Sequence, residues 1–370
     1  MSNFGEKREK SFNNSMTENR TAYFDYLRVL ANYAVIVIHV VALGIYVFDV
    51  SSSDWKVLNF YTSIFRWCVP VFLMISGALF LNRDDITLKK LFTKYVFRLF
   101  TAYWVWSFVY YLFDGDSVKS QLFNLIKYKP LESIHRISQS RYHLWFVPMI
   151  ICIYICIPII KQIVKNQKAS LYFLLLSFIY WLLIPQINVI FNDCLEGENL
   201  IFCNNSIYEV IQKFTPSLVI NFIFYFVLGY ELSKRQLKRE YRIIIYITGL
   251  IGAVFTIYMN QFAASKSIEL IGNYGEYNRV NVAFEAVAIF ELFKNIPFKI
   301  RKSVVCLSKL SFGAYLVHDL FIQRIKVLWV NELLTPYAIS IPIIALFILL
   351  MSLAFSALLR LIPYLNKYIA

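Results

Sequence analysis

Long apolar runs dominate this 370-residue chain and restrict the folds open to it. Stretches of about 20 mostly apolar residues recur, and this is the length that a helix needs to cross a bilayer. The composition agrees, because 59% of the residues are hydrophobic and 16% are charged, against roughly 45–50% and 25% in soluble domains. Continuous runs favour helices over the alternating strands of a membrane β-barrel. The sequence therefore predicts an all-α, polytopic membrane protein.

The apolar runs predict about ten transmembrane helices in one bundle. They cover residues 23–47, 58–81, 95–113, 144–161, 170–190, 215–233, 241–259, 280–295, 305–323 and 337–361. The eighth run is the weakest, because it is short and contains Glu285 and Glu291. We predict one transmembrane domain over 21–370, preceded by a polar, disordered cytoplasmic tail over 1–20.

The net charge of +14 bears on orientation and on partners. With the N-terminus inside, the inner segments carry about twice as many Lys and Arg residues as the outer loops, which predicts that both termini are cytoplasmic. The basic residues are spread over many short loops, so we expect membrane lipids and not nucleic acid as partners.

Two of the six cysteines, Cys194 and Cys203, fall in one predicted outer loop. An oxidising compartment would permit a disulfide between them, and two free thiols are the alternative. The sequence leaves this choice open.

Arg28 and His39 lie on one face of the first predicted span. Eleven residues make three helical turns plus about 20°, and about 16 Å along the axis, which places Arg28 near one membrane face and His39 near the midplane. Ionisable groups in a bilayer cost roughly 2.5–3.5 kcal/mol each and usually mark function. An arginine can hold a phosphate, and a neutral imidazole can accept a proton from a hydroxyl. The structural alternatives are a histidine bonded to a helix carbonyl and an arginine that pairs with Asp25 or snorkels.

A basic stripe opens the third span. Lys90, Lys94 and Arg98 follow at four-residue spacing, so they share a helical face that suits a polyphosphate. Positive-inside signalling alone would explain the lysines, whereas Arg98 lies deeper.

Further polar candidates lie toward the predicted outer face. Arg66 precedes Pro70 and Gly77, which we expect to loosen helical backbone where it lines a cavity. His143 and Trp145 begin the fourth span, where an interfacial anchor is the alternative for the tryptophan.

The eighth and ninth spans add buried polar groups. Glu285 needs a partner or a proton inside its span, and it could orient His39 or neutralise an arginine. Ser311, Tyr315 and His318 share one face of the ninth span, as a polar lining or a helix–helix seam. A metal site made by the histidines of the first, fourth and ninth spans is a minor alternative, so no metal is expected.

In this order the motifs resemble those of the acyltransferase-3 family, the integral-membrane O-acyltransferases of surface polysaccharides. The resemblance covers nearly the whole chain from Tyr23 and rests on five motifs. They are Asp25-Tyr26-Leu27-Arg28 with His39 eleven residues on; Arg66…Val69-Pro70…Ser76-Gly77; His143-Leu144-Trp145-Phe146; Phe226-Val227-Leu228-Gly229-Tyr230; and Ser311-Phe312-Gly313-Ala314-Tyr315-Leu316-Val317-His318.

The resemblance implies a bacterial inner-membrane enzyme that takes an acyl group, most simply acetyl, from cytoplasmic acetyl-CoA or another acyl-CoA. The acceptor is a hydroxyl of an envelope glycan or a lipid-linked saccharide. His39 matches the family's essential histidine and Arg28 its partner arginine. Many members carry an Arg-x-x-Arg pair at the donor mouth, for which Lys94-x-x-x-Arg98 is the nearest substitute here.

The sequence thus predicts that His39 is the general base, oriented by Glu285, and that a short-lived acyl-enzyme is a variant of direct transfer. Arg28, Lys94 and Arg98 are expected to bind the donor. Acceptor contacts are assigned to Arg66, His143, Trp145, Ser311, Tyr315 and His318. A glycan transporter or flippase, or a membrane scaffold, is the rival, although no inverted repeat is visible.

Overall fold

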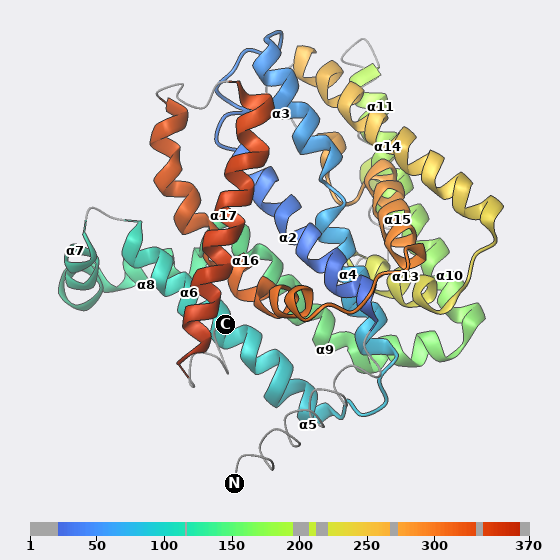
Figure 1. Cartoon of the computed structure of the whole chain (residues 1–370), viewed down its shortest axis with the longest axis horizontal. Coiled ribbons are helices and arrows are strands. Elements are labelled where there is room, and N and C mark those ends of the chain that lie inside the picture. Colours follow the sequence, from blue (N-terminus) through green and yellow to red (C-terminus); the bar gives the residue numbers. More distant parts are fainter. Residues whose placement is uncertain are drawn as a thin grey trace.

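A computed structural model describes residues 21–114, 117–194, 207–211, 221–266, 273–330 and 336–362 of the protein. Every regular element within these ranges is helical, which confirms the predicted all-α class (Figure 1). The predicted tail over 1–20 and the predicted partner Cys203 lie outside the described residues.

Seven segments of the described chain are long and apolar enough to cross a membrane, and each overlaps a predicted span. They are α2 (Ala22–Val41), α3 with α4 (Ser53–Ile64 and Cys68–Leu81), η3 with α9 (Tyr142–Trp145 and Phe146–Lys165), α10 to α11 (Gln167–Ser177 and Ile184–Cys194, joined by η4, Phe178–Leu183), α14 (Arg239–Lys266), α16 (Lys302–Val330) and α17 (Tyr337–Arg360). The other three predicted spans hold shorter helices, namely α6 (Phe97–Phe113), α13 (Ile223–Lys234) and α15 (Val280–Asn295).

The first helix ends earlier than predicted. α2 stops at Val41, and residues 42–47 form hydrogen-bonded turns in which the Gly44 N–H donates to the Val41 carbonyl at 3.0 Å. A glycine just beyond a helix commonly ends it. His39 therefore lies in the last turn of α2 and not in the middle of a longer helix.

The second predicted span, 58–81, is two helices and not one. α3 ends at Ile64 and α4 begins at Cys68, with turns between them. A proline in a helix clashes with the carbonyl four residues earlier, and for Pro70 that carbonyl belongs to Arg66. The chain breaks at this point, and the break directs Arg66 into the bundle beside Gly275.

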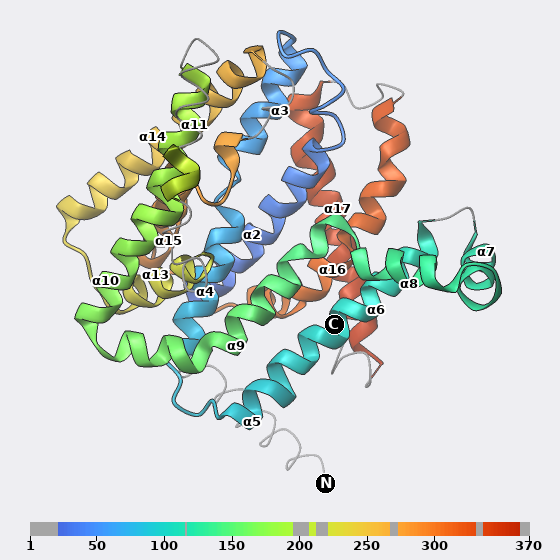
Figure 2. The ribbon, with the colours of Figure 1, turned by 180° about the vertical axis from the view of Figure 1, so that it is seen from behind.

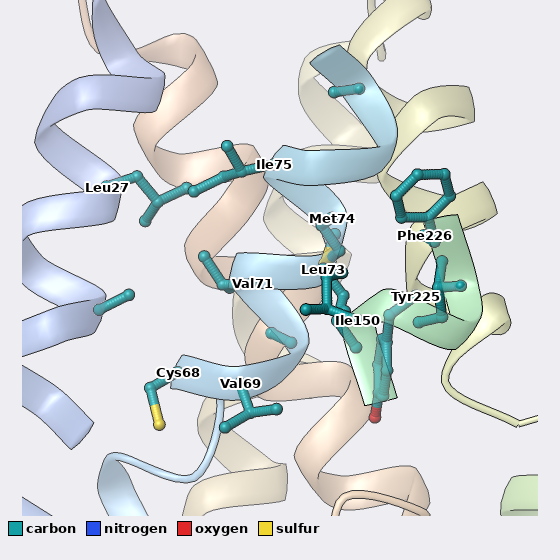
Figure 3. Packing of buried hydrophobic residues seen from close by; sticks show 14 of the residues in the cluster. Leu27, Cys68, Val69, Val71, Leu73, Met74, Ile75, Ile150, Tyr225 and Phe226 are labelled. Carbon is teal, nitrogen blue, oxygen red and sulfur yellow. The ribbon is translucent and has the colours of Figure 1, made fainter. Parts of the chain in front are cut away.

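The core forms around α2, which packs against α16, α17 and α4 (Figures 1 and 2). Figure 3 shows α4 with Leu27 of α2 on one side and Tyr225 and Phe226 of α13 on the other. All three of these side chains are fully buried. α7 (Val118–Phe123) and α8 (Pro130–Gln139) project from the side of the bundle in both views.

Glycines set the distance between α4 and α13. A Cβ on Gly77 would lie 1.7 Å from the Phe226 carbonyl oxygen, and a Cβ on Gly229 would lie 2.2 Å from that of Met74. Small residues at such contacts let helix backbones approach closely in membrane proteins. The expectation that Gly77 loosens the helix is therefore wrong, because this glycine permits close packing within a continuous α4.

Candidate active site

A cavity of about 570 Å³ lies within the bundle, between α2, α4, α6, α9, α16 and the end of α17. This volume falls in the range of small-molecule sites. Seven of the residues singled out from the sequence line it, namely Arg28, His39, Arg98, His143, Trp145, Ser311 and Tyr315. Along α2, Val35 lines the wall between Arg28 and His39, so one helix face carries both groups along the cavity.

Four cations line the cavity near the start of α2, namely Arg28, Arg98, Lys309 and Arg360. Arg28 Nη1 donates to Ser308 Oγ at 2.9 Å and lies 3.8 Å from an Asp25 carboxylate oxygen. Arg360 Nη2 donates to the Lys309 carbonyl at 2.5 Å. No Asp or Glu is among the described lining residues, so this end of the cavity suits an anion.

The Arg98 guanidinium lies over the ring of Phe312, 5.8 Å from its centroid, and close enough to Arg360 for the two charges to interact. An arginine plane against an aromatic face is held in a fixed orientation. The cluster therefore presents charge from α2, α6, α16 and α17 to a single volume.

His39 forms a hydrogen-bonded chain with α16. Its Nδ1 lies 2.9 Å from Nε2 of His318, and Nδ1 of His318 lies 2.6 Å from the Tyr315 carbonyl oxygen. His318 is fully buried and does not line the cavity. The structure thus places His318 behind His39, rather than in the cavity wall with Ser311 and Tyr315.

The start of the fourth span adds a third imidazole. η3 is a 3₁₀ turn that buries His143 with its ring centroid 4.8 Å from that of His318 and 6.1 Å from that of His39. The Tyr315 hydroxyl donates to the His143 carbonyl. No group of three or more His, Cys, Asp or Glu side chains in the described ranges is arranged to hold a metal ion.

Aromatic rings surround the same end of the cavity. Trp145 stacks on Tyr277 with ring centroids 5.7 Å apart, and both residues line the cavity. Phe222 lies against Trp145 at 5.5 Å. Trp145 is 38% exposed, so its ring is open to a ligand.

Lys94 does not line the cavity, contrary to the predicted basic stripe. Residues Leu91–Val96 form a π-helical segment, η1, whose i→i+5 bonding changes the angle between successive side chains. Lys94 is exposed as a result, and Lys90 pairs with Asp85 in the preceding loop. Arg83 and Lys90 hold the pKa of the Asp85 carboxyl well below its usual range.

Glu285 and Arg66 also lie outside the cavity wall. Glu285 Oε1 accepts from Thr256 Oγ1 at 3.1 Å, and no hydrogen bond joins Glu285 to His39 in the described structure. Arg66 runs past Gly275 toward Tyr277, close enough to His39 and Glu285 for its charge to act on both. Within the described residues Glu285 forms neither an ion pair with an arginine nor a hydrogen bond with His39, so both alternatives for its role stay predictions.

Several residues near the site were not singled out from the sequence. Lys309 and Arg360 lie near those ends of the last two predicted spans that the charge distribution assigns to the cytoplasm, and positive-inside signalling explains them equally well. Asp319 is fully buried and accepts from Arg141 Nε at 2.7 Å and from the Tyr142 hydroxyl at 3.0 Å. The sequence signal that could have identified Asp319 was its position directly after His318, a predicted site residue.

Comparison with curated proteins and with solved structures found no match. The model of the acyltransferase-3 family, described as an acyltransferase domain, matches residues 21–361. The match covers all seven membrane-spanning segments and every lining residue of the cavity. This multi-pass membrane protein therefore belongs to the acyltransferase-3 family.

Proposed function

We propose that this protein transfers an acyl group, most simply acetyl, from cytoplasmic acyl-CoA to a hydroxyl of an envelope or surface glycan, with His39 as the general base. One observation carries the proposal, namely that a single cavity joins a cluster of four cations to the half-buried imidazole of His39, about 16 Å away along one helix face. The predicted orientation, with the start of α2 inside, places the cations toward the cytoplasm.

The donor fits the cationic end. Guanidinium groups bind phosphate through paired, charge-assisted hydrogen bonds, and Arg28, Arg98 and Arg360 reach the cavity from three helices. The slender pantetheine arm would extend along the apolar wall formed by Val35 and its neighbours and bring the thioester to His39.

The acceptor fits the opposite end. Trp145 and Tyr277 offer flat apolar faces beside polar groups, which match the faces and hydroxyls of a sugar ring. His143, Ser311 and Tyr315 line the adjoining wall and would contact the acceptor or the acyl group. Lys94, Arg66 and Glu285 have no direct contact with substrate in this proposal.

The reaction needs one proton acceptor. His39 removes the proton from the acceptor hydroxyl as its oxygen attacks the thioester carbonyl and forms the new C–O bond. The tetrahedral intermediate then collapses, the C–S bond breaks, and the imidazolium returns the proton to the departing thiolate. In the acyl-enzyme variant, His39 attacks the thioester carbonyl, the C–S bond breaks and the CoA thiolate leaves. The acceptor hydroxyl then attacks the acyl-imidazolium, the C–N bond breaks, and the hydroxyl proton neutralises the thiolate.

The test is transfer of label from acetyl-CoA or succinyl-CoA to an envelope glycan extract in proteoliposomes. We expect label on glycan with the wild type and with His135→Ala, which removes an exposed histidine of α8 that is not among the lining residues. We expect a loss of about 10²–10⁴-fold with His39→Ala. Absence of transfer by the folded wild type with both donors would refute the proposal, and label retained on the protein without acceptor would indicate an acyl-enzyme.

A further inference from the structure

We infer that His318 is a positioning residue that holds His39 in the tautomer whose Nε2 carries no proton and is open to the cavity. The inference rests on the proposed function only in one part, namely that the tautomer of His39 affects the rate of acyl transfer. Its structural content is a hydrogen-bonded chain from the Tyr315 carbonyl through His318 to His39.

The direction of this chain follows from its last member. A carbonyl oxygen can only accept a hydrogen bond, so His318 Nδ1, 2.6 Å from the Tyr315 oxygen, must carry the proton. A neutral imidazole has one N–H, which leaves Nε2 of His318 as an acceptor. The facing atom at 2.9 Å, His39 Nδ1, must then be the donor.

The remaining nitrogen of His39 is therefore the basic one. Nε2 has no hydrogen-bond partner within the described part of the chain, and the side chain lines the cavity. A general base needs an unprotonated nitrogen that substrate can reach. Tyr315 thus sets, through its backbone, which nitrogen of His39 is available.

The surroundings favour a neutral His318 over an imidazolium. The carboxylate next to His318 in the sequence is Asp319, whose oxygens are engaged by Arg141 at 2.7 Å and Tyr142 at 3.0 Å. The ionic partner of Asp319 is thus an arginine, and His143 and Arg66 face the histidine pair from η3 and the α3–α4 break. Neither the His143 imidazole nor the Arg66 guanidinium is an anion, so neither would stabilise a charged His318.

The hydrogen-bonded chain from the Tyr315 carbonyl through His318 to His39, here called the relay, acts in the transition state. When His39 takes a proton on Nε2, its Nδ1–H becomes part of an imidazolium, and its bond to His318 Nε2 becomes charge-assisted and stronger. An interaction that strengthens only as the reaction proceeds raises kcat without tightening substrate binding. Loss of the His318 acceptor should therefore lower kcat and leave KM for the donor within about two-fold.

Nitrogen NMR tests the tautomer without reference to activity. The chain has four histidines, so ¹⁵N-histidine-labelled protein in nanodiscs gives four ring systems, and His39 is the one lost in His39→Gln. We expect His39 with a protonated Nδ1 and a bare Nε2. A protonated Nε2 with a bare Nδ1, or a doubly protonated His318 at neutral pH, would overturn the inference.

Two variants of His318 test the catalytic meaning. The amide oxygen of His318→Gln reaches the position of Nε2 and can accept from His39, whereas His318→Asn keeps only a group near Nδ1. We expect His318→Asn to lose about 10–100-fold in kcat, His318→Gln to retain most of it, and His135→Ala to match the wild type. Equal activity of folded His318→Asn and wild type would overturn the relay. An inactive wild type with the expected tautomer would instead remove the proposed function and leave the relay standing.

Discussion

Arg28 is held at the cavity by a hydrogen bond to Ser308 Oγ at 2.9 Å and by a longer pairing with Asp25 at 3.8 Å, among its contacts. Its side chain is 27% exposed, so it keeps access to a ligand while its position is fixed. A guanidinium placed in this way supplies binding energy to the ground state and the transition state alike.

Removing the Arg28 guanidinium should therefore weaken donor binding more than it slows the chemistry. We expect Arg28→Ala to raise KM for acyl-CoA by about 10–100-fold, because a hydrogen bond to a charged group contributes about 1.5–3 kcal/mol. Arg28→Lys should recover part of this loss, since it keeps the charge without the paired donors. Initial rates against donor concentration measure the effect, with the exposed Arg239→Ala as control. A fall in kcat at constant KM would contradict a donor role.

At the scale of single residues, the sequence predicted that Arg28 and His39 lie on the same face of α2, because helical spacing alone places them there. It did not predict the hydrogen bond from His39 to His318, since residues 279 positions apart meet only through tertiary packing. The assignment of Lys94 failed for a local reason, because a π-helical turn cannot be recognised from four-residue spacing.

The close contact of α4 and α13 depends on glycines at the crossing. Gly229→Ala places a methyl group against the Met74 backbone, which cannot move as a flexible side chain could. We expect a loss of stability of about 1–3 kcal/mol, as for other overpacked cores. A lower melting temperature in detergent measures it, and the lipid-exposed Leu79→Ala on α4 is the control. A Gly229→Ala variant as stable as the wild type would show that the helices can separate at no cost.

The ion pair of Arg141 and Asp319 ties the start of the fourth span to α16. Arg141→Ala leaves a fully buried carboxylate with its charge uncompensated, which costs about 3–5 kcal/mol in comparable pairs. Asp319→Asn should cost less, because the Tyr142 hydroxyl keeps an acceptor. Thermal unfolding of the two single variants and the double variant tests this, and strictly additive losses would show that the pair is not coupled.

Helix positions were predictable at the element scale, since seven predicted spans coincide with long apolar helices. The break before Cys68 was predictable too, because Pro70 sits where its ring opposes the Arg66 carbonyl. The 3₁₀ turn that buries His143 depends on contacts with α16 and has no signature in the local sequence.

The whole molecule should have both ends on the cytoplasmic side, as its charge distribution predicts. Lys238 lies between α13 and α14, and Gln139 ends α8 on the projecting pair of helices. In a background with all six cysteines replaced by serine, we expect an impermeant maleimide to label Gln139→Cys in intact cells. Lys238→Cys should react only after the membrane is opened. The reverse pattern would invert the topology and place the four cations outside.

The apolar wall between the cations and the imidazoles has a consequence for the host membrane. Along α2, α4 and α9 that wall consists of side chains such as Val35, Phe72 and Phe146, and the rings of Phe72 and Phe146 lie 6.2 Å apart. Where the wall is apolar, a small ion would lose water without gaining a ligand in exchange, which raises the cost of its passage. A neutral acyl arm meets no such barrier. If the proposed transfer runs through this cavity, these side chains would favour a neutral acyl group over an ion, and acyl transfer would then proceed with little loss of the membrane potential.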